Sequence, residues 1–153
     1  MSDIVRKVSH VGICVSDVDR SIAFYRDVLG FAPVHELRVE GEASDTLLRL
    51  RGVRLHAVFL ERDGFRIELL HYDSPRSPAV ALARTMNDLG FTHLSVMVAD
   101  IDDALARLER AGTKVERDTR IEVGGRTVAA MFRDPDGLLI ELVMRDPTEA
   151  RSS

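Results

Sequence analysis

The stretch HVGICV at residues 10–15 decides the fold, because HLSVMV at residues 93–98 repeats its pattern later in the chain. Each stretch begins with a histidine and then places apolar residues at every second position, which is typical of a strand with one buried face. The interval from His10 to His93 equals the interval from Asp17 to Asp100. The pattern predicts two copies of one supersecondary unit.

A second repeated motif lies near the end of each half. An aspartate–glycine turn precedes Ile-Glu-Leu, which places Glu68 in the first half and Glu141 in the second. The interval between these glutamates is shorter than the interval between the histidines, and one longer loop in the first half would account for the difference. Each half therefore offers one histidine and one glutamate at equivalent strand positions. Pseudo-twofold symmetry would bring His10, Glu68, His93 and Glu141 together.

Both halves are predicted to run strand, helix and then three strands. The helices begin at Asp17 and Asp100 and end at Gly30 and Gly112, because aspartate is a favoured N-cap and glycine a favoured C-terminal stop. Residues 44–52 (SDTLLRLRG) are interpreted as a short helix or lid, and a further short helix is predicted at residues 79–88, after a proline-rich break. The predicted strands are residues 8–15, 34–39, 54–60, 65–72, 93–98, 114–118, 127–133 and 138–144.

Composition narrows the class of protein. The 153 residues are 45% hydrophobic and 30% charged, which suits one globular domain, and no apolar run is long enough to cross a membrane. A net charge of −4 with dispersed basic residues argues against nucleic acid as a partner. The single cysteine, Cys14, excludes an internal disulfide. Because the N-terminus also lacks a signal pattern, a cytoplasmic protein is expected.

Structural roles, rather than metal binding, account for most of the other polar residues. His35, His56 and His71 have no counterpart in the other half and are interpreted as structural. Cys14 is expected to pack, and the aspartates are assigned to helix starts (Asp17, Asp19, Asp100, Asp102) or to a turn (Asp134, Asp136). Glu68 and Glu141 could likewise be surface positions balanced by Arg66 or Arg145. That alternative weakens because both glutamates and both histidines obey one internal symmetry.

The alternation also indicates what the glutamates face. Ile67 and Leu69 match Ile140 and Leu142 as the packed face, so Glu68 and Glu141 share the opposite face with the histidines. A carboxylate buried in a sheet needs a cation or strong donor beside it, and a divalent metal would satisfy both carboxylates. Nitrogen and oxygen ligands without thiolate suit Ni, Zn, Mn, Co or Fe.

The motifs HVGICVSDVDRSIAFYRDVLGF, FRIELL, FTHLSVMVADIDDALARLERAG and FRDPDGLLIELV resemble those of the vicinal oxygen chelate superfamily. That superfamily contains glyoxalase I, methylmalonyl-CoA epimerase, extradiol dioxygenases and fosfomycin- and bleomycin-resistance proteins. The resemblance implies an α+β fold, in which two βαβββ modules form an incomplete eight-stranded barrel around one metal. It implies one domain over residues 1–153, with module one at about 6–72, a linker at about 73–90 and module two at about 91–146. It also implies a homodimer and places metal ligands at His10, Glu68, His93 and Glu141.

The expected activity follows from these ligands. A divalent metal acts as a Lewis acid for a small substrate with adjacent oxygens, and a carboxylate removes the proton next to the chelated carbonyl. We therefore expect a lyase or isomerase of the glyoxalase I-like type, with Glu141, and Glu68 beside it, as catalytic carboxylates. One alternative is an Fe(II)-dependent extradiol-type dioxygenase that uses His10, His93 and Glu141. Another is a small-molecule-binding or resistance protein.

Overall fold

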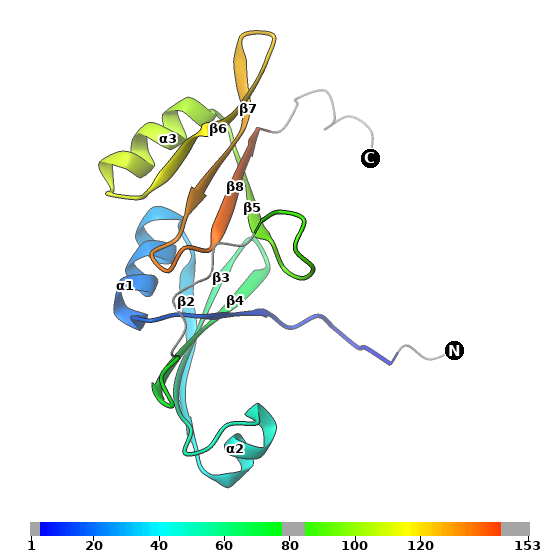
Figure 1. Cartoon of the computed structure of the whole chain (residues 1–153), viewed down its shortest axis with the longest axis vertical. Coiled ribbons are helices and arrows are strands. Elements are labelled where there is room, and N and C mark those ends of the chain that lie inside the picture. Colours follow the sequence, from blue (N-terminus) through cyan, green and yellow to red (C-terminus); the bar gives the residue numbers. More distant parts are fainter. Residues whose placement is uncertain (1–3, 78–84, 145–153) are drawn as a thin grey trace. The chain divides into compact units, whose positions relative to one another are not determined.

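The computed structural model describes residues 4–77 and 85–144, which belong to two compact units (residues 1–79 and 80–153). Each unit contains one four-stranded mixed sheet with a helix between its first two strands (Figure 1). The predicted α+β class and the βαβββ order are therefore confirmed in both units. Each sheet is open, with two edge strands.

In the first unit the strand order is β1-β4-β3-β2, and β1 runs parallel to β4. Asp17 caps the first helix through its side chain, which accepts a hydrogen bond from the Arg20 amide, as the sequence predicts. That helix continues into a π-helical segment, η1, and the chain turns at Gly30 with a φ of 72°. The elements are β1 (Val11–Cys14), α1 (Val18–Ala23), η1 (Phe24–Val28), β2 (Ala32–Glu40), α2 (Glu42–Leu48), β3 (Arg54–Arg62) and β4 (Phe65–Ser74).

The second unit repeats this topology with the strand order β5-β8-β7-β6. Asp100 caps its helix by accepting a hydrogen bond from the Asp103 amide. The strand β6 is longer than predicted because it is an edge strand with many exposed residues, so the alternation that marks a half-buried strand is weak there. The elements are β5 (His93–Val98), α3 (Ile101–Arg110), β6 (Val115–Val123), β7 (Arg126–Arg133) and β8 (Leu139–Met144).

Strand register confirms the internal repeat residue by residue. Gly12 of β1 lies opposite Glu68 of β4, and Ser95 of β5 lies opposite Glu141 of β8. Ser95 follows Gly12 by the same interval at which the second histidine follows the first. Because side chains alternate along a strand, the residue two before Gly12, His10, shares the face of Glu68. The same holds for His93 and Glu141.

Each unit has a core on the other face of its sheet, and the first unit also has a buried cluster that contains Leu55 and Ala57 on the face of Glu68. Ile67 and Leu69 are fully buried in the first unit, and Ile140 and Leu142 are almost fully buried in the second. In each unit these residues flank the glutamate, so packing of the aliphatic side chains directs the carboxylate to the opposite face. We name the two glutamate-bearing faces the first and second site faces.

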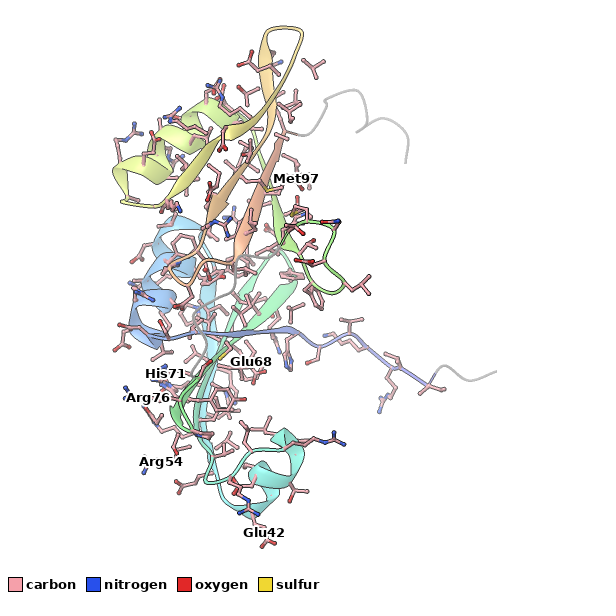
Figure 2. All side chains as sticks on the ribbon, in the orientation of Figure 1. Glu42, Arg54, Glu68, His71, Arg76 and Met97 are labelled. Atoms are coloured by element: carbon pink, nitrogen blue, oxygen red, sulfur yellow. The ribbon has the colours of Figure 1, made fainter. Side chains whose placement is uncertain are left out.

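The short helix α2 lies beside the first site face. Leu48 packs with Leu37 and Val39 against a buried cluster that contains Leu55, while Leu47 remains exposed. The Asp45 carboxylate accepts hydrogen bonds of 2.7 Å from the amides of Gly52 and Val53, which closes the segment back onto β3. The predicted short helix is thus confirmed, although it begins at Glu42. Figure 2 shows Glu42 on α2 and Glu68 on β4.

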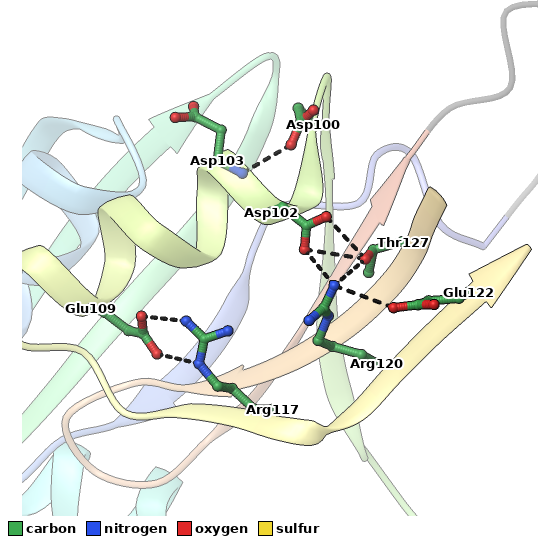
Figure 3. A network of polar contacts seen from close by, with 8 residues as sticks. All are labelled: Asp100, Asp102, Asp103, Glu109, Arg117, Arg120, Glu122 and Thr127. Atoms are coloured by element: carbon green, nitrogen blue, oxygen red, sulfur yellow. Dashed lines mark hydrogen bonds and ion pairs between the residues drawn. The ribbon is translucent and has the colours of Figure 1, made fainter. Parts of the chain in front are cut away.

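In the second unit a polar network joins α3 to β6 and β7 (Figure 3). Arg120 donates to the Asp102 carboxylate and to the Thr127 hydroxyl at 2.8 and 2.7 Å, and Thr127 is itself bound to Asp102. A bidentate pair between Arg117 and Glu109 adds a second link between β6 and α3. Asp102 therefore has a structural role beyond the helix start that the sequence indicates.

Some sequence predictions concern residues that are not described. The predicted helix at residues 79–88 lies outside the described residues except for 85–88, which form a turn. Arg145, one of the two arginines considered as a partner for a glutamate, also lies outside them. Within residues 4–77 and 85–144, no helix is both long and apolar enough to span a membrane.

Candidate metal centre

In the first unit, His10 and Glu68 form a direct pair. The His10 Nε2 atom lies 3.0 Å from the Glu68 Oε2 atom, and both side chains are partly exposed. Gly12 leaves room beside them, because a Cβ at this position would lie 3.2 Å from the Leu70 Cδ1 atom and 3.9 Å from Glu68 Oε2. The Phe59 ring meets the His10 ring edge-on at 5.1 Å, which limits how the imidazole can turn.

The second unit holds the equivalent pair. The His93 Nε2 atom lies 3.4 Å from the Glu141 Oε2 atom, so this pair is looser than the first. Ser95 and Met131 occupy the strand positions on either side of Glu141, where the first unit has Gly12 and Phe59 beside Glu68.

A hydroxyl group contacts the other nitrogen of each imidazole. The Ser9 Oγ atom lies 2.8 Å from His10 Nδ1, and the Thr92 Oγ1 atom lies 2.9 Å from His93 Nδ1. When Nδ1 carries the proton and donates it to the hydroxyl oxygen, Nε2 keeps its lone pair for a metal. Sequence reasoning missed these two residues, although each directly precedes its histidine and so repeats at the same interval.

The structure does not support the interpretation of Glu68 as a surface residue balanced by Arg66. Arg66, proposed from the sequence as its balancing cation, instead binds Glu61 through its Nε and Nη2 atoms at 3.0 and 2.6 Å. Glu68 is therefore left facing an imidazole, which is uncharged in its neutral form. A bound cation would offset the desolvation of this partly buried carboxylate.

The pair distances also fit shared coordination of a metal. Two donor atoms held about 2.1 Å from one six-coordinate ion, at right angles, lie about 3.0 Å apart. The observed 3.0 and 3.4 Å are close to that value. Among the described residues, no three His, Cys, Asp or Glu side chains gather as a metal site. The structure thus brings the four predicted ligands together as two pairs, one in each unit, and their union in one site stays a prediction.

A family model described as the Glyoxalase/Bleomycin resistance protein/Dioxygenase superfamily matches residues 7–142. The chain belongs to this superfamily.

Curated relatives fall into several branches. The uncharacterized protein YaeR of Escherichia coli K12 is 34% identical over 142 residues, which cover 90% of this chain and 95% of that protein. An ethylmalonyl-CoA/methylmalonyl-CoA epimerase of Cereibacter sphaeroides is 28% identical and covers 90% and 97%. A probable chloroplastic lactoylglutathione lyase of Arabidopsis thaliana is 29% identical over 94% of this chain. The chain spans only 37% of that relative and 46% of two further plant relatives.

Solved structures share the superfamily fold. A glyoxalase family protein from Bacillus cereus superposes with a TM-score of 0.79 at 23% identity and covers 94% of this chain and 96% of its own. A variant of the fosfomycin resistance protein FosX from Listeria monocytogenes, complexed with Mn(II) and a dihydroxypropylphosphonic acid, gives 0.61 at 18% identity, covering 92% and 90%. At these identities the likeness shows the fold alone.

The remaining histidines of this superfamily member have other surroundings. His56 is largely buried and its Nε2 atom lies 2.7 Å from Glu36 Oε1, and the His71 Nδ1 atom lies 3.3 Å from the Val15 carbonyl oxygen. Both occupy the face opposite Glu68, as the structural interpretation predicts. His35 differs, because its ring lies 5.8 Å from the Phe59 ring on the first site face.

Cys14 is exposed on the first site face, so the prediction that it packs is wrong. Tyr72 lies on the same face of β4, four residues beyond Glu68. Burial raises the pKa of the Tyr72 hydroxyl, and the negative charges of ionised Cys14 and Glu68 raise it further. Sequence reasoning did not select Tyr72, since its position beside Cys14 depends on the parallel pairing of β1 with β4.

Proposed function

We propose that this protein is a divalent-metal-dependent lyase or isomerase of the glyoxalase I-like type, which removes a proton from the carbon next to a chelated carbonyl. The observation that carries the proposal is the repeated arrangement of hydroxyl, imidazole and carboxylate: Ser9, His10 and Glu68 in one unit, and Thr92, His93 and Glu141 in the other. The proposed ligands of one ion are His10, Glu68, His93 and Glu141.

The proposed ligands suit such an ion chemically. When bound, a divalent ion (Ni, Zn, Mn, Co or Fe) would polarise the carbonyl oxygen of a substrate with adjacent oxygens and thereby acidify the neighbouring carbon. An imidazole binds a metal in its neutral form, so the two carboxylates would balance the charge of the ion. This leaves the donor set close to neutral overall.

Within this proposal Glu141 is the base. Its carboxylate is farther from its imidazole than that of Glu68, and its side chain is more exposed, 27% against 17%. A looser carboxylate is the better candidate to take a proton from carbon and return it to the adjacent carbon. The shorter contact between His10 and Glu68 suits a ligand that remains in place.

The test joins metal content to proton exchange. The metal-free protein is loaded with each ion in turn, and deuterium incorporation from solvent into candidate substrates is followed. The candidates are hemithioacetals of 2-oxoaldehydes and branched acyl thioesters, because the relatives include a probable lactoylglutathione lyase and an ethylmalonyl-CoA/methylmalonyl-CoA epimerase. The expected result is exchange in at least one combination, which is lost in His93→Ala together with the metal. Absence of exchange with every ion would overturn the proposal. Oxygen uptake with a catechol would replace it with the dioxygenase alternative, and stoichiometric binding without turnover would replace it with the binding protein.

A further inference from the structure

Tyr72 occupies a distinct position on the first site face. It lies on the same strand as Glu68, β4, and four residues further on, so the two side chains share a face with their Cα atoms about 13 Å apart. Across the sheet, Tyr72 pairs with Leu55 of β3. Tyr72 is half-buried, which leaves part of the side chain accessible.

Aliphatic side chains hold the Tyr72 ring in place. Together with Leu37, Val39 and Leu70, the ring packs against the buried cluster Val53, Leu55 and Ala57, and Leu48 of α2 packs against the same cluster. The side chain is therefore anchored through its ring, while part of it stays accessible.

The Tyr72 hydroxyl is a donor at neutral pH. Because burial and the charges of ionised Cys14 and Glu68 all raise the pKa of this phenol above its ordinary value, the group stays protonated under physiological conditions. A protonated phenol on the same face as a carboxylate presents a hydrogen-bond donor to an incoming oxygen.

Two aliphatic side chains and the exposed Cys14 thiol surround Tyr72 on the first site face. Its neighbours across the sheet and along β4 are Leu55 and Leu70. Arg66, on the far side of Glu68 along the same strand, is already bound to Glu61. A substrate that extends from Glu68 towards Tyr72 thus meets the aliphatic side chain of Leu70, the Cys14 thiol and the Tyr72 hydroxyl.

We propose that the Tyr72 hydroxyl donates a hydrogen bond to an oxygen in the body of the substrate, beyond its chelated carbonyl, and so determines specificity. The substrate class is an acyl or keto compound with one such acceptor on an otherwise apolar body. This inference rests on the proposed function, because the chelated end of the substrate is placed by the pairs at His10 and Glu68 and at His93 and Glu141.

Hydroxamates are suitable probes, because they chelate divalent ions through two adjacent oxygens. Binding of alkyl hydroxamates and of keto-alkyl hydroxamates matched in length is measured by calorimetry on the metal-loaded wild type and on Tyr72→Phe. We expect the wild type to prefer at least one keto compound to its matched alkyl compound. Tyr72→Phe should lose that preference, with binding weaker by roughly 2- to 12-fold, and retain its affinity for the alkyl series.

The composition supplies a matched control and a second readout. The chain has two tyrosines and no tryptophan, and Tyr25 is fully buried in η1. Tyr25→Phe removes the same hydroxyl elsewhere and should retain the keto preference. In that variant Tyr72 is the sole tyrosine, so its fluorescence should change when a keto hydroxamate binds. This readout keeps residue 72 native.

The outcomes separate the two proposals. A keto preference that persists in Tyr72→Phe overturns this inference alone, as does a wild type that binds both series equally. If no hydroxamate binds to the metal-loaded wild type, the proposed function fails and this inference fails with it. Unchanged Tyr72 fluorescence in Tyr25→Phe, when the keto compound is bound, also overturns it.

Discussion

The hydroxyls of Ser9 and Thr92 provide a direct test of whether the two histidine–glutamate pairs serve one ion. Each hydroxyl lies within hydrogen-bond distance of the Nδ1 atom of its histidine, at 2.8 and 2.9 Å. Removing such a partner of a metal-bound histidine typically weakens metal affinity about 10- to 100-fold. We therefore expect Ser9→Ala and Thr92→Val each to weaken the binding of Co(II) by about 10-fold.

The double variant is the informative measurement. If His10 and His93 bind the same ion, both losses act on one equilibrium, and their product predicts binding about 100-fold weaker at one ion per chain. If each pair holds its own ion, the titration shows two ions per chain, and each substitution weakens only one of them. Competition with a coloured chelator gives both the affinity and the stoichiometry.

A matched control separates loss of the contact to Nδ1 from general damage to the fold. Within the described residues, the contacts found at the ring nitrogens of His10 and His93 do not include Thr113. The metal affinity of Thr113→Val should therefore equal that of the wild type. Unchanged Co(II) affinity in both Ser9→Ala and Thr92→Val, with thermal stability retained, would refute the role assigned to the hydroxyls. A stoichiometry of two ions per chain would refute the single shared centre.

Four further predictions concern single measurements. Elemental analysis of reconstituted protein should show that His93→Ala loses metal, whereas equal metal content in wild type and His93→Ala would remove His93 from the ligand set. Adding metal to the metal-free wild type should raise its melting temperature. Glu141→Gln, with metal content confirmed, should lose about 100-fold or more in kcat, the usual range for a general base, whereas near-wild-type solvent exchange would exclude Glu141 as the base. Hydrogen bonds from the Val53 and Gly52 amides lower the pKa of Asp45. The stabilisation that Asp45 gives the fold is therefore present above its ordinary pKa of about 3.9 and is lost as pH falls through its lowered pKa. Urea unfolding should show Asp45→Ala less stable than wild type at pH 7, with the difference shrinking below pH 4, and a difference independent of pH would contradict this. The open sheets leave β1, β2, β5 and β6 at edges, so light scattering at micromolar concentration should give a dimer, and a monomer would count against that expectation.

The parts of the fold that repeat are accessible from sequence. Alternation in residues 10–15 and 93–98 indicates the buried face of each first strand, and the repeated spacing of the motifs predicts the equivalence of Glu68 and Glu141 that the register confirms. Both N-caps are predictable because the hydrogen bond from a backbone amide to the capping aspartate joins residues that are close in sequence. These features depend on residues close in sequence or on a repeated spacing.

The features that sequence reasoning missed depend on contacts between strands. The exposure of Cys14 and the neighbouring position of Tyr72 follow from the parallel pairing of β1 with β4, which joins segments far apart in sequence. The hydroxyls of Ser9 and Thr92 repeat at the expected spacing, but only the backbone conformation decides whether a hydroxyl reaches the neighbouring imidazole. Arg66 is a reasonable partner for Glu68 by sequence, yet it pairs directly across the sheet with Glu61.

The unequal surroundings of the two pairs have a consequence for protein engineering. In the first unit, the glutamate-bearing face adjoins a packed aliphatic cluster and α2. In the second unit Met97 and Ile121 stand exposed on their strands. Substitutions along Leu37, Leu55 and Leu70 can therefore be selected for new substrates while the histidine and glutamate of the second unit keep their own local packing. A library confined to the first unit, screened for retained metal content before activity, would explore substrate range separately from catalytic competence.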